Sequence, residues 1–238
     1  MIDNSQKQKI EELQTQIHAQ FEHEVLHILN GQMMYEQFSK HELMKKGQYV
    51  PFNEAMCSNE TTNNIFSNEF NHKRASGHQV SLQEYEEITI TPLKSLFEHK
   101  YKCIVLWFGD DMFCQMNLLT ALALLEQERF KGKVRVHMIN EVTDEVNAID
   151  MLLVGYKKVY EQVLIHHHPP EVQLHPVMEL GMKRYLEYKK EENEITNYIK
   201  ERIDMPWDEL LNQLFQQFPH YGLGDLQYIN LIKAVKET

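Results

Sequence analysis

One segment constrains the fold more than any other: a continuous apolar stretch at residues 102–108, KCIVLWF, with a polar turn and a nearly uncharged segment (112–127) after it. A strand without polar alternation is buried on both faces, which is typical of parallel sheets with helices on either side. The turn, Gly109-Asp110-Asp111, predicts a strand that passes directly into a helix. The pattern therefore predicts an α/β fold with this unit at its centre.

Three further β-rich runs, at residues 24–29, 48–52 and 133–139, alternate with predicted helices. We expect helices over 33–46, from Ser67, from the Ser81-Glu84 capping box and over 143–165. Alternating strands and helices at this spacing indicate a three-layer α/β domain with a mostly parallel, Rossmann-like sheet. We place this domain at residues 23–168.

Helical segments are predicted at both ends of the chain. Residues 1–22 form an amphipathic helix whose apolar stripe is Ile10, Leu13, Ile17 and Phe21. This stripe must pack on the body of the subunit or on a second copy, so a homodimer is one of two expectations. Residues 169–238 form a small all-α unit, with helices over 177–202, after Pro206 and after Gly224-Asp225.

Composition excludes several partners. The 24 basic and 35 acidic side chains give a formal charge of -11 without a basic stripe, so we expect no nucleic acid partner. Three cysteines at long spacings do not form a disulfide framework, and the N-terminus lacks a signal-peptide pattern. The longest apolar run is far below the ~20 residues of a membrane span. These features predict a cytoplasmic protein without a membrane partner.

No motif identifies a cofactor, which therefore stays unknown. With nine glycines, the chain lacks GxGxxG and GxxxxGK[ST], and it has neither GxSxG nor HExxH. Carboxylates at the strand ends would suit Mg²⁺ or Mn²⁺, but nothing in their spacing requires a metal, and we predict none. The consecutive histidines 166–168 point in different directions on a helix and cannot easily share one ion.

The most informative feature is the polar cluster that follows each strand. The four clusters are Asn30-Gly31, Asn53-Glu54, Gly109-Asp110-Asp111 and Asn140-Glu141. Carboxyl ends of parallel strands share one edge of the sheet, where α/β proteins bind ligands. The alternative is that these residues are only turns and helix caps, for which Asn, Asp and Gly are also favoured.

Candidate roles follow from side-chain chemistry. Arg74 and His78, four residues apart, would form a cationic wall for an anionic ligand, or else lie exposed at the surface without a site role. Gln115 lies in an otherwise apolar helix and needs a partner, either a ligand or the backbone of a neighbouring loop. Cys57 and Cys114 become reactive if a cation or a helix N-terminus lies close, and Cys114 lies in a first helical turn. The alternative for both is a buried, inert cysteine. The candidate catalytic residues are Glu54, Asp111 and Glu141, and the candidate ligand-binding residues are Asn30, Asn53, Arg74, His78, Asp110 and Gln115.

Three strings resemble the bacterial family named domain of unknown function 1835. They are VPFNEAMCSNET (50–61), FSNEFNHKRASGH (66–78) and IVLWFGDDMFCQMNLLTALALLEQ (104–127), and FPHYGLGDLQ (218–227) is similar to a helical segment of longer relatives. The most specific pattern is W-F-x-x-D-x-F-x-Q-x-N-L-L, which starts at Trp107. The resemblance covers about residues 24–232 and implies a fold and a candidate site, but no established activity. It departs from the family after the first strand, where Asn30-Gly31 replaces the usual Gly-Asp.

Members of that family are often labelled AraC-type regulators, a role that the acidic charge and the lack of a basic helix-turn-helix segment do not favour. Two hypotheses remain. In the first, the α/β domain binds a small polar or anionic ligand at the strand ends and acts as a hydrolase or transferase. In the second, the protein is a non-enzymatic regulator or scaffold that acts through its terminal helices.

Overall fold

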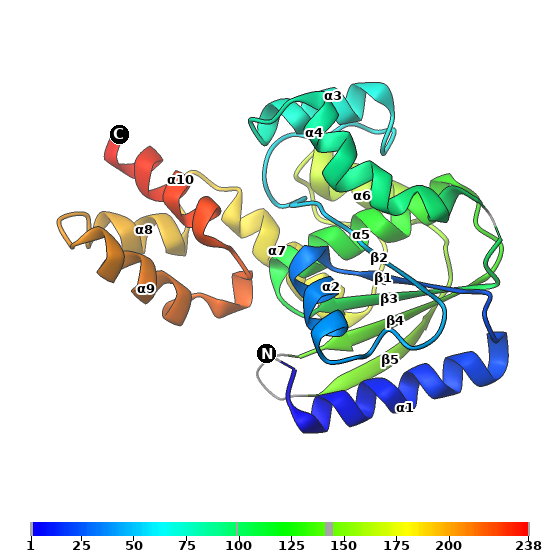
Figure 1. Ribbon diagram of the computed structural model, residues 1–238. Coiled ribbons are helices and arrows are strands. Elements are labelled where there is room, and N and C mark those ends of the chain that lie inside the picture. The colour runs from blue at the N-terminus through cyan, green and yellow to red at the C-terminus, as the bar shows by residue number, and fades with distance from the viewer. Residues whose placement is uncertain (1, 99, 141–144, 238) are drawn as a thin grey trace.

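The computed structural model describes residues 2–98, 100–140 and 145–237. Its centre is a sheet with the strand order β2-β1-β3-β4-β5 (Figure 1). The first four strands are parallel, and β5 runs antiparallel to β4. The strands are β1 (Val25–Leu29), β2 (Gln48–Pro51), β3 (Cys103–Gly109), β4 (Lys133–Ile139) and β5 (Val146–Met151). The prediction of an α/β fold with a mostly parallel sheet is confirmed.

The apolar run at 102–108 forms the central strand, β3, and every residue of this strand is buried. β1 and β4 flank it, with Trp107 in register with Leu29 on one side and with His137 on the other. The chain adds β2 on one side of β1 and then crosses to place β3 on the other. The order of the strands therefore reverses between β1 and β3, which is the switch point where such sheets bind ligands.

Two helices cover one face of the sheet: α1 (Asn4–Phe21) and α2 (Gly31–Lys40). The predicted amphipathic helix is confirmed, because Ile10, Leu13 and Ile17 are buried in one cluster with Val105 and Trp107. The apolar stripe is thus covered within the subunit. Asp3 caps α1 together with Gln6 in a capping box, which fixes where the helix begins.

On the other face, α5 (Met112–Gln127) packs on β3, and α6 (Tyr156–Tyr160) and α7 (Pro176–Tyr188) pack on α5. All three helices contribute to a second apolar cluster. α5 is buried on nearly all sides, as its lack of charge predicts. The sheet and its two helical layers make the three-layer arrangement. The helix start predicted at Ser67 and the capping box predicted at Ser81 are confirmed by α3 (Asn68–Gly77) and α4 (Leu82–Tyr85), and both serines cap their helices.

The helical C-terminal segment lies to one side of the sheet (Figure 1). It contains α8 (Glu194–Lys200), α9 (Trp207–Gln217) and α10 (Asp225–Glu237). α7 connects it to the sheet and crosses α5 closely, since a Cβ atom on Gly181 would stand 2.5 Å from the Cβ atom of Gln115. No helix in the described ranges is long and apolar enough to cross a lipid bilayer.

The prediction of one helix over 143–165 is wrong. Residues 143 and 144 lie outside the described residues, and the chain then forms β5 before α6 begins at Tyr156. β5 is an edge strand with polar, exposed positions, so its sequence lacks the apolar run that identifies an inner strand. Asp150 pairs across the strands with Arg135, their oxygen and nitrogen 2.6 Å apart.

The single helix predicted over 177–202 is also wrong. α7 ends at Tyr188, and α8 begins after Asn193, whose side chain accepts hydrogen bonds from the Ile195 and Thr196 amides. An asparagine that bonds to the next turn in this way starts a new helix and interrupts the old one. The break lets α8 turn away from the sheet.

Candidate functional site

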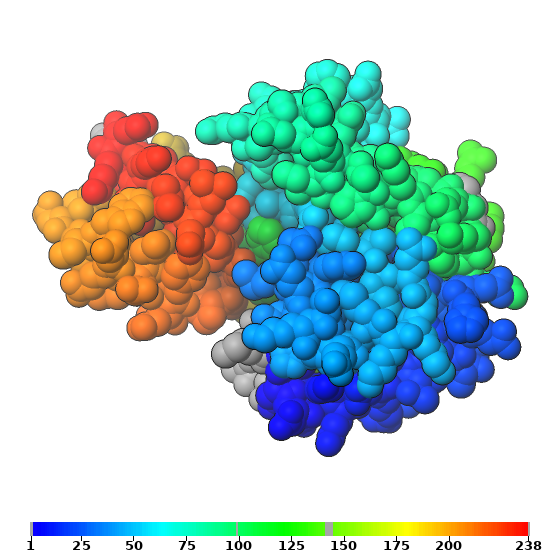
Figure 2. All heavy atoms as spheres, viewed as in Figure 1, coloured from blue at the N-terminus to red at the C-terminus, as the bar shows by residue number. Residues whose placement is uncertain are grey.

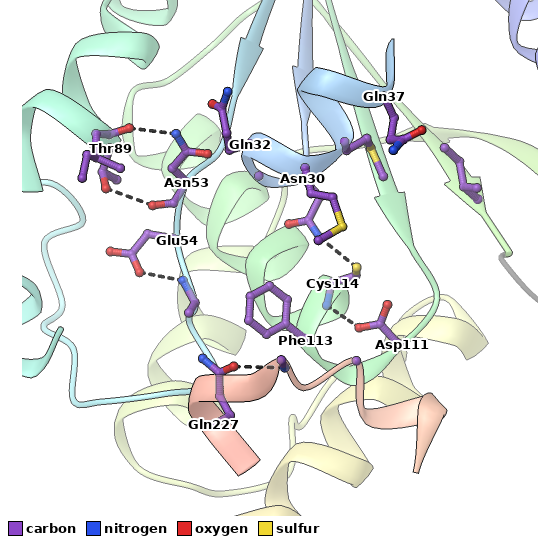
Figure 3. A pocket seen from close by; sticks show the side chains of 18 of the residues that line it. Asn30, Gln32, Gln37, Asn53, Glu54, Thr89, Asp111, Phe113, Cys114 and Gln227 are labelled. Carbon is purple, nitrogen blue, oxygen red and sulfur yellow. Dashed lines mark hydrogen bonds between the residues drawn. The ribbon is translucent and has the colours of Figure 1, made fainter. Parts of the chain in front are cut away.

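A cavity of about 740 Å³ opens at the carboxyl edge of the sheet. Its wall contains Asn30 after β1, Asn53 and Glu54 after β2, and Asp111 after β3. Figure 2 shows this hollow between α2, the α3–α4 region and the C-terminal helices, and Figure 3 shows the polar side chains around it. Three of the four predicted polar clusters therefore meet in one place.

The rest of the wall comes from distant parts of the chain. α2 contributes Met33 and Met34, and the C-terminal segment contributes Gly222, Gly224 and Gln227. The start of the chain adds Ile2 and Gln6. Further apolar lining residues are Phe38, Val80, Ile88, Phe113 and Ile139. The cavity thus combines polar groups at the sheet edge with a largely apolar surround, as small-molecule sites usually do.

Glu54 forms the most elaborate polar network of the site. Its carboxylate accepts hydrogen bonds from Arg74 Nε (3.1 Å) and Nη2 (2.5 Å), from the Tyr85 hydroxyl (2.5 Å) and from the Ala55 amide (2.9 Å). Burial alone raises the pKa of this carboxyl, but the Arg74 charge and the bonds from His78 and Arg74 outweigh it and hold the pKa at about 2. A carboxylate with this pKa and these partners is a weak general base.

Arg74 has no exposed surface and does not line the cavity. Besides Glu54, its guanidinium donates to the carbonyl oxygens of Ser58 (2.6 Å) and Ala55 (2.9 Å). Burial alone lowers its pKa, but the charge and hydrogen bonds of Glu54 raise it, so it stays charged. Because its donors are engaged behind the wall, Arg74 fixes the loop after β2 and is not exposed to an anionic ligand.

His78 does line the cavity, as the second member of the predicted cationic wall. Its Nε2 lies 3.3 Å from Glu54 Oε2 and 3.1 Å from Arg74 Nη2. The ring also stacks on Tyr85, with 6.3 Å between centroids. His78 is therefore the one predicted cationic residue that the structure places at the surface of the cavity.

Asp111 is the N-cap of α5, where its Oδ1 accepts from the Cys114 amide at 2.8 Å. The C-terminal segment packs directly on this carboxylate. A Cβ atom on Gly222 would stand 2.0 Å from Asp111 Oδ1, and the backbone φ of Gly222 is +64°. Only glycine fits both demands, so Gly222 closes one side of the cavity against the helix N-terminus.

Asn117 determines how the groups after β1 and β2 face one another. Its Oδ1 accepts from the Met56 amide (2.9 Å), and its Nδ2 donates to the Glu54 carbonyl (2.6 Å) and to Asn30 Oδ1 (2.8 Å). The backbone partners fix the orientation of the Asn117 amide, and this in turn fixes that of Asn30. The Asn30 Nδ2 group must then donate to Cys114 Sγ, which lies 2.8 Å away (Figure 3).

Asn53 presents an acceptor at the cavity. Its Nδ2 donates to the Ile88 carbonyl (2.8 Å), which fixes the amide orientation, and its Oδ1 is buried without a hydrogen-bond partner among the described residues. On α2, the Gln37 Oε1 atom is likewise buried and unpartnered within the described chain. Buried acceptors without donors are costly, and a ligand with N–H or O–H groups would satisfy them.

The remaining candidates lie outside the cavity lining. Gln115 is fully buried below it, and its side chain donates to the Gly109 carbonyl at 2.6 Å. Of the two partners expected for Gln115, a ligand or loop backbone, the structure has the backbone. Asp110 accepts from Asn140 Nδ2 at 2.6 Å and joins the ends of β3 and β4. Glu141 lies outside the described residues. The described residues contain no group of three or more His, Cys, Asp or Glu placed to hold a metal ion.

Sequence reasoning missed Tyr85, Asn117 and the contribution of the C-terminal segment. A buried Asn in an apolar helix is the same signal that pointed to Gln115, two residues earlier, but the sequence does not distinguish their surroundings. Gly222 had a weak signal, since paired glycines in a helical region are unusual. Tyr85 carried no signal, because a tyrosine on a short helix is ordinary core composition.

Comparison of the chain with models of known families, with characterised proteins and with solved structures gives no match.

Proposed function

We propose that this protein binds a small polar ligand in the strand-end cavity. The observation that supports this most is the convergence of Asn30, Asn53, Glu54 and Asp111 on one hollow at the switch point of the sheet. Caps and turns alone do not require a cavity of about 740 Å³ behind them. The resemblance to domain of unknown function 1835 fits the proposal, since its most specific motif runs from Trp107 into α5 at this site.

Charge favours a neutral or cationic ligand over an anionic one. Glu54 and Asp111 line the cavity, and His78 is the one histidine among its described lining residues, which include no lysine or arginine. Arg74, which would attract an anion, is buried and engaged. We therefore propose a ligand that offers hydrogen-bond donors to Asn53 and Gln37 and an apolar portion to Met33, Met34 and Phe113.

A thermal-shift screen of metabolites tests this proposal. A ligand at 100 times its Kd stabilises the folded state by about 2.7 kcal/mol, which raises the Tm of a protein of this size by roughly 5–10 °C. Hits should be amines, amides or alcohols, and Asn53→Ala should abolish their effect, whereas Asn63→Ala, at an exposed site outside the cavity, should not. Hits that are mainly phosphates or carboxylates would contradict the charge argument.

An enzymatic function is favoured by one observation, the environment of Cys114. The thiol lines the cavity in the first turn of α5, and Asn30 donates a hydrogen bond to its sulfur. The predicted carboxylate chemistry has less support, because Glu54 is ion-paired and Asp111 caps the helix. We propose Cys114 as the nucleophile of a hydrolase or transferase. Loss of turnover in Cys114→Ala, with ligand binding retained, is the expected result once a substrate is found.

A further inference from the structure

The two ends of α1 contact different parts of the molecule. At its start, Ile2 and Gln6 line the ligand cavity, and Gln6 Nε2 donates to the Asn140 carbonyl at 3.4 Å. At its other end, His18 meets His27 of β1, with 3.2 Å between the two Nε2 atoms. Figure 1 shows α1 along one side of the sheet, from the N-terminus to the turn into β1. Whatever loosens α1 therefore also removes part of the cavity wall.

The His18–His27 contact has only one possible proton arrangement. Trp107 Nε1 is a donor only and lies 3.0 Å from His27 Nδ1, so His27 carries its proton on Nε2. His18 Nδ1 lies 2.6 Å from the Glu22 carbonyl, an acceptor only, so His18 carries its proton on Nδ1. His27 Nε2 then donates to His18 Nε2. Both neutral rings have all their nitrogens satisfied.

A further proton breaks this arrangement. The one nitrogen that can take it is His18 Nε2, since His27 Nδ1 already accepts from Trp107. Protonation there brings two N–H groups face to face at the 3.2 Å contact. It also places a positive charge in a buried contact with an uncharged neighbour. The charged form is therefore favoured when His18 has moved away from His27, as it does when the end of α1 leaves the sheet.

Among the residues that the structure describes, neither ring has a carboxylate partner that would compensate the charge. Tyr49 of β2 stacks on His27 at 4.3 Å, and His137 of β4 lies on the other side of Trp107, with both of its ring nitrogens unpartnered among the described residues. The charged pair of Arg135 with Asp150 acts on His137. No described hydrogen bond or ion pair joins His18 or His27 to a carboxylate. Burial, and then the charges of His18 and His137, keep the pKa of His27 well below its ordinary value.

We propose that the His18–His27 contact is a pH-sensitive latch, whose protonation releases α1 from the sheet and opens the cavity wall formed by Ile2 and Gln6. A solvated imidazole has a pKa of about 6.5, so once α1 is released the rings can take up protons from water. Protonation of each ring then shifts the equilibrium between packed and released α1 toward the released state, by up to roughly tenfold for each pH unit below that value. The release of α1 does not depend on any ligand, while its effect on binding rests on the proposed function.

Hydrogen exchange of residues 4–21 tests the latch without a ligand. Rates are measured at pH 7.5 and 5.0, corrected for the intrinsic effect of pH, and compared with those of α5 in the same sample. The latch predicts that α1 protection falls at pH 5.0 by up to roughly a thousandfold relative to α5. This limit assumes up to about tenfold per pH unit for each of two histidines over the 1.5 pH units between about 6.5 and 5.0. Equal protection of α1 at both pH values would overturn the proposal.

The variant His18→Gln is a neutral mimic of the latch. Its amide oxygen can accept from His27 and its amide nitrogen can donate to the Glu22 carbonyl, so the network survives with one titrating ring fewer. When the pH is lowered from 7.5 to 5.0, we expect the protection of α1 in this variant to fall by a factor that is up to roughly thirtyfold smaller than in the wild type. His72→Gln, at an exposed histidine of α3, is the matched control and should behave as wild type. An unchanged pH dependence in His18→Gln would overturn the proposal.

Histidine NMR on the wild type keeps the test independent of any variant. The latch predicts that the His18 and His27 rings titrate together with the loss of α1 protection. Titration of both rings with α1 still protected would overturn it. In a separate arm, a hit from the metabolite screen should bind more weakly at pH 5.0 than at pH 7.5, with a smaller difference in His18→Gln. A screen without hits would count against the proposed function and leave the exchange result to decide on the latch.

Discussion

At the scale of single residues, the surroundings of each polar side chain determine whether it is available to a ligand or is engaged in stabilising the fold. Glu54 and Arg74 have fully buried side chains and are paired through two hydrogen bonds. Removing one member of such a pair leaves an uncompensated buried charge, which is far costlier than losing an exposed pair. The pair therefore supports the loop that carries Asn53 into the cavity.

Arg74→Met should destabilise the fold by about 3–5 kcal/mol, because it leaves Glu54 charged and buried without its partner. Lys73→Met is the matched control on the same helix, since Lys73 pairs with Glu60 at the surface. This control should leave stability almost unchanged. Urea unfolding of the two variants measures the difference. Similar midpoints for both would show that the buried pair contributes no more than the exposed one.

The depressed pKa of Glu54 also predicts a pH effect. The folded-state pKa is about 2 and the ordinary value is 4.5, so the stabilisation by ionised Glu54 is complete above pH 4.5 and is lost as the pH falls toward 2. The unfolding free energies of wild type and Glu54→Gln should therefore approach each other as the pH is lowered below 4.5. Unfolding curves at pH 6, 4 and 3 measure this gap. A gap that stays constant would contradict the assignment.

Cys114 should be the first cysteine to react with iodoacetamide in the native protein. Burial raises the pKa of the Cys57 thiol to about 12 and that of Cys103 to about 11, which keeps both unreactive. Cys114 lines the cavity and receives the Asn30 hydrogen bond. Asn30→Ala should slow its alkylation about tenfold, by removing a donor to the thiolate. Mass spectrometry of the labelled peptides measures the rates, and preferential labelling of Cys57 or Cys103 would contradict this account.

At the scale of elements, the site depends on α5 joining the ends of three strands. Asn117 is the side chain that makes this joint, through the loop after β2 and through Asn30 after β1. The side chain of Gln115, two residues earlier, bonds only to the carbonyl of Gly109 and to Met138 Sδ among the described residues. Two buried amides on one helix thus have different importance for the arrangement of the cavity.

Asn117→Leu should cost at least about 2 kcal/mol more than Gln115→Leu. The first change leaves the Met56 amide, the Glu54 carbonyl and Asn30 Oδ1 without a partner, at about 1–3 kcal/mol for each buried group. The second leaves one carbonyl unpaired and removes an amide oxygen, Gln115 Oε1, that has no partner among the described residues. Chemical denaturation of both variants compares the costs. A larger loss of unfolding free energy in Gln115→Leu would show that the packing of α7 on Gln115 stabilises the fold more than the hydrogen bonds of Asn117 do.

Several elements were predictable from the sequence because their signals are local. The inner strands, the caps Ser67 and Ser81 and the helix after Asp111 follow from short patterns of apolar and capping residues. β5 was not predictable, because an edge strand has the polarity of an exposed helix. Within the site, residue types at the strand ends were predictable, but the engagement of Arg74 was not. Its partners in the loop after β2 lie 14 to 20 residues away and are defined only once that loop folds.

At the scale of the whole molecule, both ends of the chain complete a cavity that the sheet edge only begins. Ile2 and Gln6 enter from α1, and Gly222, Gly224 and Gln227 enter from the C-terminal segment. The close approach of Gly222 to Asp111 ties that segment to the start of α5. The terminal helices, which the scaffold hypothesis treats as docking elements, are thus part of the wall of the proposed ligand site.

The most direct test of that site is a methyl spectrum of the protein labelled with ¹³C-methyl methionine, titrated with the strongest hit of the metabolite screen. Met33 and Met34 line the cavity, whereas Met178 and Met182 are buried on α7 and serve as internal references. Ligand binding at the strand ends predicts saturable shifts of the Met33 and Met34 signals, with little change at Met178 and Met182. Saturable shifts of the α7 methionines, with Met33 and Met34 unchanged, would contradict the account.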